Sequence, residues 1–157
     1  MNKKTIEFGI LILGFNRPEL LERTLSALVN ISDLKDSIGF FSLDGPRNNP
    51  DVEAVKQCQE VFSKYQGSFQ ETINLFAESN LGLRNKVLQC VTQAFEYVDN
   101  LIVLEDDCVV GETTIDYFRF GFNWLQGQPL GVISGNYLGK AQQEKAFLAK
   151  RFSSWGW

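Results

Sequence analysis

The sequence predicts an α/β fold in which a mostly parallel sheet lies between two layers of helices, a three-layer α/β/α sandwich. Short apolar runs typical of buried strands alternate with longer segments of helical periodicity. Polar or turn-forming residues follow these apolar runs, as they do at the carboxyl ends of strands in such sheets. With 157 residues, of which 44% are hydrophobic, we expect one domain that spans residues 1–157.

The first half of the chain predicts two strands and two helices. Phe8–Leu13 is apolar throughout, which is typical of a strand that is buried on both faces. Asn16 and Glu19 form a capping-box pattern at the start of a helix, with Pro18 in its first turn. Leu21, Leu25 and Leu28 mark the buried side of this helix by their spacing. The next elements expected are a strand at 38–43 and a helix at 51–65 with Val55, Cys58 and Phe62 on one side.

The second half predicts two more strand and helix pairs. Ile73, Leu75 and Ala77 alternate as in a strand. The elements expected after it are a helix with Val87, Val91 and Phe95 on one side, a strand at 101–104, an aromatic helix at 113–125, a short strand at Val132–Ile133 and a polar stretch at 141–151.

Composition excludes several classes of protein. The net charge of -4 argues against a nucleic-acid partner, since phosphate binding needs clustered basic residues. The chain has no histidine, which removes every Ser-His or Cys-His catalytic arrangement and the commonest zinc ligand. Three widely spaced cysteines predict free thiols and a cytoplasmic location. No apolar stretch reaches the ~20 residues of a transmembrane segment.

Three acidic residues, Glu105, Asp106 and Asp107, stand directly after the fourth predicted strand. Adjacent carboxylates repel one another unless a cation or hydrogen-bond donors offset their charge. A divalent metal such as Mg²⁺ or Mn²⁺ meets this need, because it binds carboxylate oxygens and leaves coordination positions for phosphate. For an isolated triplet a solvated strand end is an equal alternative, and the position in an α/β sheet favours the metal site.

Arg17, Asp44 and Arg84 also follow predicted strands. Arg17, at a helix start, can meet a phosphate together with the helix amides, or pair with a nearby carboxylate. Asp44 can accept hydrogen bonds from a nucleobase or ribose, or only shape its own loop. Asn80 and Arg84 can instead cap the following helix. Because the carboxyl ends of parallel strands meet at one edge, we expect these residues and the acidic run to converge on one cleft.

Four segments together resemble the GT-A glycosyltransferases, in particular the family 2 type and the related N-acetylglucosaminyltransferase I group. They are Phe15–Pro18, Ser42–Gly45, Asn80–Asn85 and Val103–Asp107, and their order and spacing match over nearly the whole chain. The resemblance implies a Rossmann-like nucleotide-diphospho-sugar transferase fold. It also implies transfer of a sugar from a nucleotide-diphosphate donor, expected to be a UDP-sugar, to the hydroxyl of a glycan, lipid-linked or protein acceptor.

The resemblance further implies roles for single residues. Arg17 and Asp44 would hold the nucleoside, with Asp44 near the base, and Arg84 would lie near the donor phosphate or sugar. The acidic run takes the place of the DxD motif, in which Asp107 would bind Mn²⁺ or Mg²⁺ and Glu105–Asp106 would touch ribose or sugar hydroxyls. A metal that bridges the diphosphate would offset the charge that develops on the leaving group.

The last residues of the chain also match a segment of this family. Ser154–Trp157 resembles the aromatic loop beside the donor sugar, with core packing as an equal alternative. The family's general base lies later, so we expect a chain cut short at its C-terminus and a base beyond Trp157.

A sugar-phosphate nucleotidyltransferase stays open as an alternative function, although Phe15–Pro18 is not the Gly-rich basic loop that it needs. So does a non-catalytic sugar-nucleotide-binding domain, whereas dehydrogenases and P-loop NTPases lack their motifs here.

Overall fold

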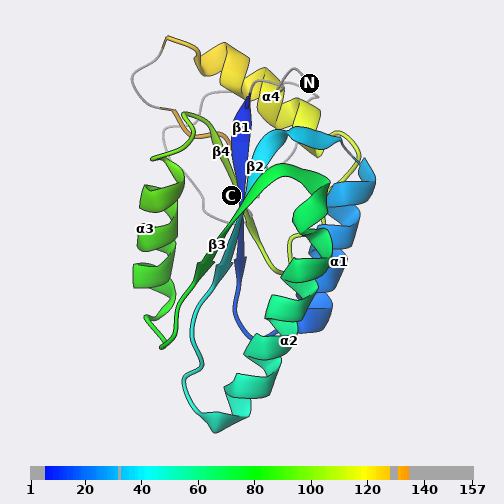
Figure 1. The fold of residues 1–157 in the computed structure, drawn as a ribbon. Helices are drawn as coiled ribbons and strands as arrows, with labels where there is room; N and C mark the ends of the chain where they lie inside the picture. The colour runs from blue at the N-terminus through cyan, green and yellow to red at the C-terminus, as the bar shows by residue number, and fades with distance from the viewer. Residues whose placement is uncertain (1–5, 32, 128–130, 135–157) are drawn as a thin grey trace, which may run out of the picture.

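The computed structural model describes residues 6–31, 33–127 and 131–134. Strands and helices alternate along this part of the chain (Figure 1). The elements are β1 (Phe8–Gly14), α1 (Pro18–Ile31), β2 (Leu34–Leu43), α2 (Asn49–Tyr65), a 3-10 turn η1 (Gln66–Ser68), β3 (Phe69–Phe76), α3 (Leu83–Ala94), β4 (Leu101–Glu105) and α4 (Thr114–Leu125).

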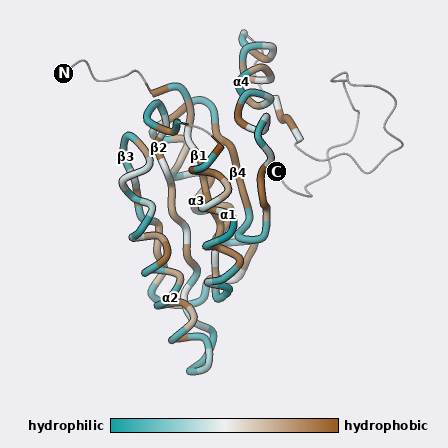
Figure 2. Tube along the Cα trace, turned by 90° about the vertical axis from the view of Figure 1, so that its right-hand side faces the viewer, coloured by the Kyte–Doolittle hydropathy of each residue, from teal (hydrophilic) through white to brown (hydrophobic). Residues whose placement is uncertain are grey.

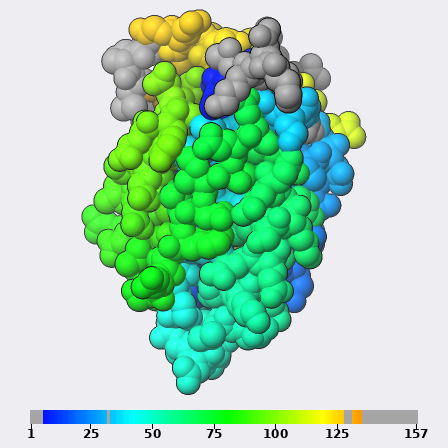
Figure 3. Space-filling model, in the orientation of Figure 1, coloured from blue at the N-terminus to red at the C-terminus, as the bar shows by residue number. Residues whose placement is uncertain are grey.

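The four strands form one parallel sheet in the order β3-β2-β1-β4. Figure 1 shows α1 and α2 on one side of the sheet and α3 on the other, which confirms the predicted α/β sandwich. Seen toward the β3 edge, the surface is formed mainly by α2, β3 and α3 (Figure 3). No helix in the described ranges is long and apolar enough to cross a membrane.

The apolar run of β1 is explained by helices on both faces. Ile10 and Ile12 pack in the core cluster that includes Leu21, Leu25 and Leu28 of α1. Leu11 and Leu13 point the other way and pack with Cys90 and Ala94 of α3. Successive side chains of a strand alternate between its faces, so a strand covered on both sides carries apolar residues at every position. Figure 2 shows the central strands largely in the hydrophobic colours.

The register aligns the carboxyl ends of the strands at one edge. Gly14 pairs with Leu43, Leu43 pairs with Phe76, and Leu13 pairs with Glu105. The chain leaves β1 toward β2 on one side, whereas β4 returns to the other side of β1. The gap between the ends of β1 and β4 is therefore the topological switch point, the usual place for a ligand in an open α/β sheet.

The helix α4 lies at the opposite end of the sheet (Figure 1). Its Arg119 forms ion pairs with Glu7, just before β1, and with Asp36 near the start of β2. The guanidinium also lies 5.4 Å from the ring centroid of Phe8. Since these contacts hold α4 over the amino ends of the strands, the carboxyl edge is left to the loops that carry the predicted site residues.

Three details of the predictions were wrong. Lys86, Cys90 and Ala94 of α3 are buried, and Val87 and Val91 pack against the same core as predicted, but Phe95 is 52% exposed. Val132–Ile133 forms no strand, because Ile133 packs beside Gly121 of α4 and not in the sheet. Among the described residues Asn16 does not cap α1 but donates a hydrogen bond to Asp51 in the first turn of α2.

Candidate functional site

The carboxyl edge of β1 and β4 brings together the arginine and the acidic run. Arg17 Nε donates to Asp106 Oδ2 at 3.2 Å, and Arg17 Nη2 donates to Asp106 Oδ1. The third nitrogen, Nη1, donates to Asp107 Oδ2 at 3.1 Å. One guanidinium therefore binds two adjacent carboxylates across the switch point. We name this group of Arg17, Asp106 and Asp107 the β1/β4 corner.

A buried threonine fixes the backbone of the same corner. Thr24 is fully buried, and its hydroxyl donates to the carbonyl oxygen of Asp106 at 2.9 Å. Arg17 stands at the start of α1, and residues seven positions apart lie on the same face of a helix. The start of α1 thus holds Asp106 twice, by its carboxylate through Arg17 and by its carbonyl through Thr24.

The two aspartates differ in their contact with water. The side chain of Asp106 is 3% exposed and that of Asp107 is 44% exposed, while Arg17 is 46% exposed. Burial raises the pKa of Asp106, and the hydrogen bonds from Arg17 act against that rise. The hydrogen bonds to Asp106 are the largest cause of the raised pKa of Arg17. Asp106 is therefore held as a buried counter-ion, whereas Asp107 reaches solvent.

The chemistry of the corner suits a metal that brings other ligands with it. Among the described residues, no group of three or more His, Cys, Asp or Glu side chains is arranged to hold a metal ion. Mg²⁺ does not need such a group, because it is commonly bound by one or two carboxylates together with water and substrate phosphates. Exposed Asp107 fits that description, and Asp106 does not, because Arg17 binds both of its oxygens.

A second group of contacts lies at the carboxyl ends of β2 and β3, and we name it the β2/β3 corner. Asp44 follows β2 and is 6% exposed. Its Oδ1 accepts from the amides of Gly45 at 2.9 Å and Leu81 at 2.8 Å. Its Oδ2 accepts from the side chain of Asn80 at 3.1 Å and the amide of Gly82 at 3.0 Å. All four of these donors belong to the chain's own loops.

Two glycines are required by the shape of this corner. A Cβ atom at Gly45 would lie 2.4 Å from the backbone of Ser79, so only glycine permits the two loops to approach. Gly82 has a φ of 77°, in the region that favours glycine, and precedes α3. The loop-shaping interpretation of Asp44 accounts for every contact that it makes among the described residues.

Arg84 lies in the first turn of α3 and is exposed. Within the described ranges it makes no hydrogen bond or ion pair, so it is not held toward either corner. Neighbouring Leu83 is 78% exposed. The polar loops thus share one edge of the sheet as predicted, but their contacts form two separate corners and not one continuous cluster.

Sequence reasoning missed a third buried carboxylate at this edge, beside Asp44 and Asp106. Asp51 is 5% exposed, accepts from Arg47 Nε at 2.8 Å and from Asn16 Nδ2 at 2.7 Å, and has a pKa lowered to about 2 by Arg47 first of all. The guanidinium of Arg47 lies 4.9 Å from the ring centroid of Phe15. The only sequence signal was the i,i+4 spacing of Arg47 and Asp51 at a helix start.

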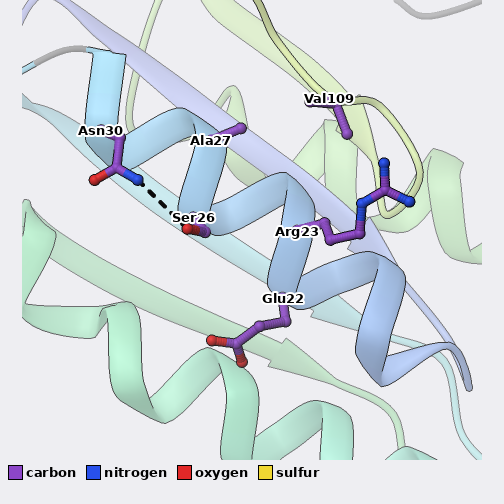
Figure 4. A pocket seen from close by; sticks show the side chains of 6 residues that line it. All are labelled: Glu22, Arg23, Ser26, Ala27, Asn30 and Val109. Atoms are coloured by element: carbon purple, nitrogen blue, oxygen red, sulfur yellow. Dashed lines mark hydrogen bonds between the residues drawn. The ribbon is translucent and has the colours of Figure 1, made fainter.

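A surface depression beside α1 has a lining that differs from these corners. It is lined by one side of α1 and by Val109, in the segment that follows β4 (Figure 4). The α1 residues are Glu22, Arg23, Ser26, Ala27 and Asn30. None of the predicted site residues lines it. The aromatic segment Ser154–Trp157, predicted beside the donor sugar, lies outside the described residues.

Comparison with known proteins identifies the fold. No protein-family model and no curated protein matches the sequence. Among solved structures, TarS of S. aureus, a glycosyltransferase, is similar, with a TM-score of 0.58 and 12% sequence identity. The similarity covers 75% of this chain and 20% of the TarS chain, so the chain spans only a small part of that protein's length. This likeness shows the fold alone, a Rossmann-like α/β fold that the chain shares with part of TarS.

Proposed function

We propose that this chain is the donor-binding part of a metal-dependent glycosyltransferase that uses a nucleotide-diphosphate sugar, in the first place a UDP-sugar. The observation that carries the proposal is the β1/β4 corner, where a guanidinium and an exposed carboxylate meet at the switch point of a glycosyltransferase-like sheet. The guanidinium suits phosphate oxygens, and the carboxylate suits a hard metal ion.

In this proposal the residues of the β1/β4 corner divide the work. Asp107 would hold Mn²⁺ or Mg²⁺, which as a Lewis acid supplies charge stabilisation for the departing diphosphate. Arg17 would hold the diphosphate in place with a preorganised guanidinium that needs no reorganisation during the reaction. Thr24 and Asp106 would keep both groups at fixed positions. Glu105, the last residue of β4, would touch ribose or sugar hydroxyls of the donor.

The β2/β3 corner completes the proposed donor site. Asp44 would act on the nucleoside through the loop that it shapes, and Arg84, exposed at the start of α3, would approach the donor phosphate or sugar. The same proposal includes an acceptor, which is a hydroxyl group of a glycan, a lipid or a protein, and a general base that acts on this hydroxyl. A cytoplasmic location is proposed because Cys58, Cys90 and Cys108 are free thiols.

The structure gives less support to the other functions. A sugar-phosphate nucleotidyltransferase grips a triphosphate with a Gly-rich, basic loop, whereas the loop after β1 is Phe15–Pro18, which has one basic residue and no glycine. A binding domain without chemistry would use the same corners, so only turnover separates it from the enzyme.

The experiment that tests the proposal is a calorimetric titration of the chain with UDP, in the presence of Mn²⁺ and again with the metal chelated. We expect binding with the metal and at least tenfold weaker binding without it, because Asp107 would hold the metal and the metal would supply positive charge for the diphosphate. A screen of UDP-sugars and GDP-sugars for thermal stabilisation then identifies the donor. A folded chain that binds no nucleotide diphosphate under either condition would overturn the proposal.

A further inference from the structure

The β1/β4 corner contains two ion pairs of different strength that share one arginine. Asp106 receives two of the three guanidinium nitrogens and is 3% exposed. Asp107 receives only Nη1, and both partners in that pair are nearly half exposed. Exposed ion pairs contribute little, whereas breaking a pair that contains a buried charge is costly. If one of the two pairs opens, it is the pair with Asp107.

We infer that Arg17 couples metal binding to donor binding by exchanging the partner of a single nitrogen, while Asp106 keeps the arginine in place. This inference rests on the proposed function. In the free chain, Arg17 Nη1 neutralises Asp107, the carboxylate that the metal needs. Binding of the metal at Asp107 leaves Nη1 without its partner, and a diphosphate oxygen replaces that partner.

The exchange gives each residue a distinct role. Asp106 is a positioning residue, because both of its oxygens are bound to Arg17 and its carbonyl is bound to Thr24. Asp107 alternates between Arg17 and the metal. When the metal binds alone, the pair between Arg17 Nη1 and Asp107 is lost without replacement, which weakens metal binding. When a diphosphate is also bound, its oxygen replaces the lost partner of Nη1. Metal and donor therefore bind with positive coupling, and by linkage each raises the affinity of the other by the same factor.

Arg17→Lys is the variant that isolates this exchange. A lysine keeps a positive charge for buried Asp106, so the chain is expected to fold, but its compact ammonium cannot bind two carboxylates in the forked geometry of arginine. Arg23→Lys is the matched control, because Arg23 is an exposed arginine of the same helix that makes no hydrogen bond or ion pair within the described ranges.

Two affinities are measured for each variant: that for Mn²⁺ alone, from the electron paramagnetic resonance signal of the free ion, and that for UDP at saturating Mn²⁺. In Arg17→Lys we expect Mn²⁺ alone to bind about threefold tighter, the range of an exposed ion pair. We expect UDP to bind at least tenfold weaker, the range of a hydrogen bond to a charged group. Both affinities of Arg23→Lys should equal those of the parent chain.

The opposite changes in one variant are the decisive feature, because general destabilisation would weaken both affinities. The inference is overturned if Arg17→Lys binds Mn²⁺ alone no more tightly than the parent chain while UDP binding falls, since Arg17 would then contact the donor without restraining Asp107. If the parent chain binds UDP equally well with and without Mn²⁺, the metal part of the proposed function fails first, and the coupling fails with it.

Discussion

The two corners at the carboxyl edge of the sheet stabilise a buried carboxylate in different ways. Each contains a buried carboxylate, Asp106 after β4 and Asp44 after β2. Asp106 is neutralised by a guanidinium that is 46% exposed, whereas Asp44 receives three backbone amides and one side-chain amide. Backbone donors are fixed once the loop is built, but a long side chain can change partners. We conclude that the β2/β3 corner is suited to hold shape and the β1/β4 corner to exchange ligands.

The largest loss of stability is expected from Asp44→Ala, which removes the central carboxylate of the β2/β3 corner. Removal of the carboxylate leaves the amides of Gly45, Leu81 and Gly82 without their acceptor, and each unsatisfied buried donor costs about 1–3 kcal/mol. Because the loop can rearrange toward water, we expect a total loss of about 3 kcal/mol in the free energy of unfolding, measured with urea. Asp99→Ala, an exposed aspartate before β4, is the control and should change stability by less than about 0.5 kcal/mol.

A smaller loss of stability is expected from Arg17→Gln in the β1/β4 corner. The substitution leaves the carboxylate of Asp106 buried without its counter-ion. Loss of one partner of a fully buried pair costs about 3–5 kcal/mol, and the exposure of Arg17 reduces this to about 1–3 kcal/mol. Urea unfolding checks the value against Arg23→Gln. A loss above that of Asp44→Ala would reverse the comparison between the corners.

Thr24→Val tests the backbone anchor of the β1/β4 corner. Valine has nearly the same shape but cannot donate to the carbonyl of Asp106. We expect a loss of about 1 kcal/mol in the free energy of unfolding, and Thr24→Ser should retain most of the stability because it keeps the hydroxyl. Equal stability of the valine and serine variants would show that the hydrogen bond contributes nothing.

The smallest effect is a pH dependence from Asp51, which lies beside Arg47 and Asn16. Its pKa is lowered to about 2, so its contribution to stability is fully present above the ordinary value of about 3.9 and is lost as the pH falls toward 2. Unfolding of the parent chain should therefore show an acid-dependent loss between about pH 4 and pH 2 that is diminished in Asp51→Asn. Identical profiles for the two chains would contradict this assignment.

The fold could be predicted because its signals are local and redundant. The fully apolar run of β1 reports helices on both faces, and the leucines of α1 at helical spacing report its buried side. The buried side of α3 was predicted in part: Val87 and Val91 pack against the core, but Lys86 was missed, whose amine donates to the carbonyl of Leu75 and so permits burial. A pattern of apolar residues alone does not report a buried lysine.

The candidate site could be predicted only in part. Strand ends located Arg17, Asp44 and the acidic run at one edge, because parallel strands share the direction of their ends. The division into two corners could not be predicted, since it depends on which of several donors reaches each carboxylate. Asn16 illustrates this limit: its spacing to Glu19 predicts a cap, but its side chain binds Asp51, 35 residues away.

The central claim is that Asp107 binds a metal ion and that this ion in turn binds the diphosphate of the donor. The most direct test compares Asp107→Ala with Asp99→Ala, which removes the same carboxylate at the other end of β4, by titration with UDP in the presence and absence of Mn²⁺. We predict that Mn²⁺ strengthens UDP binding at least tenfold in the parent chain and in Asp99→Ala, and that this gain disappears in Asp107→Ala. A gain that persists unchanged in folded Asp107→Ala would contradict the claim.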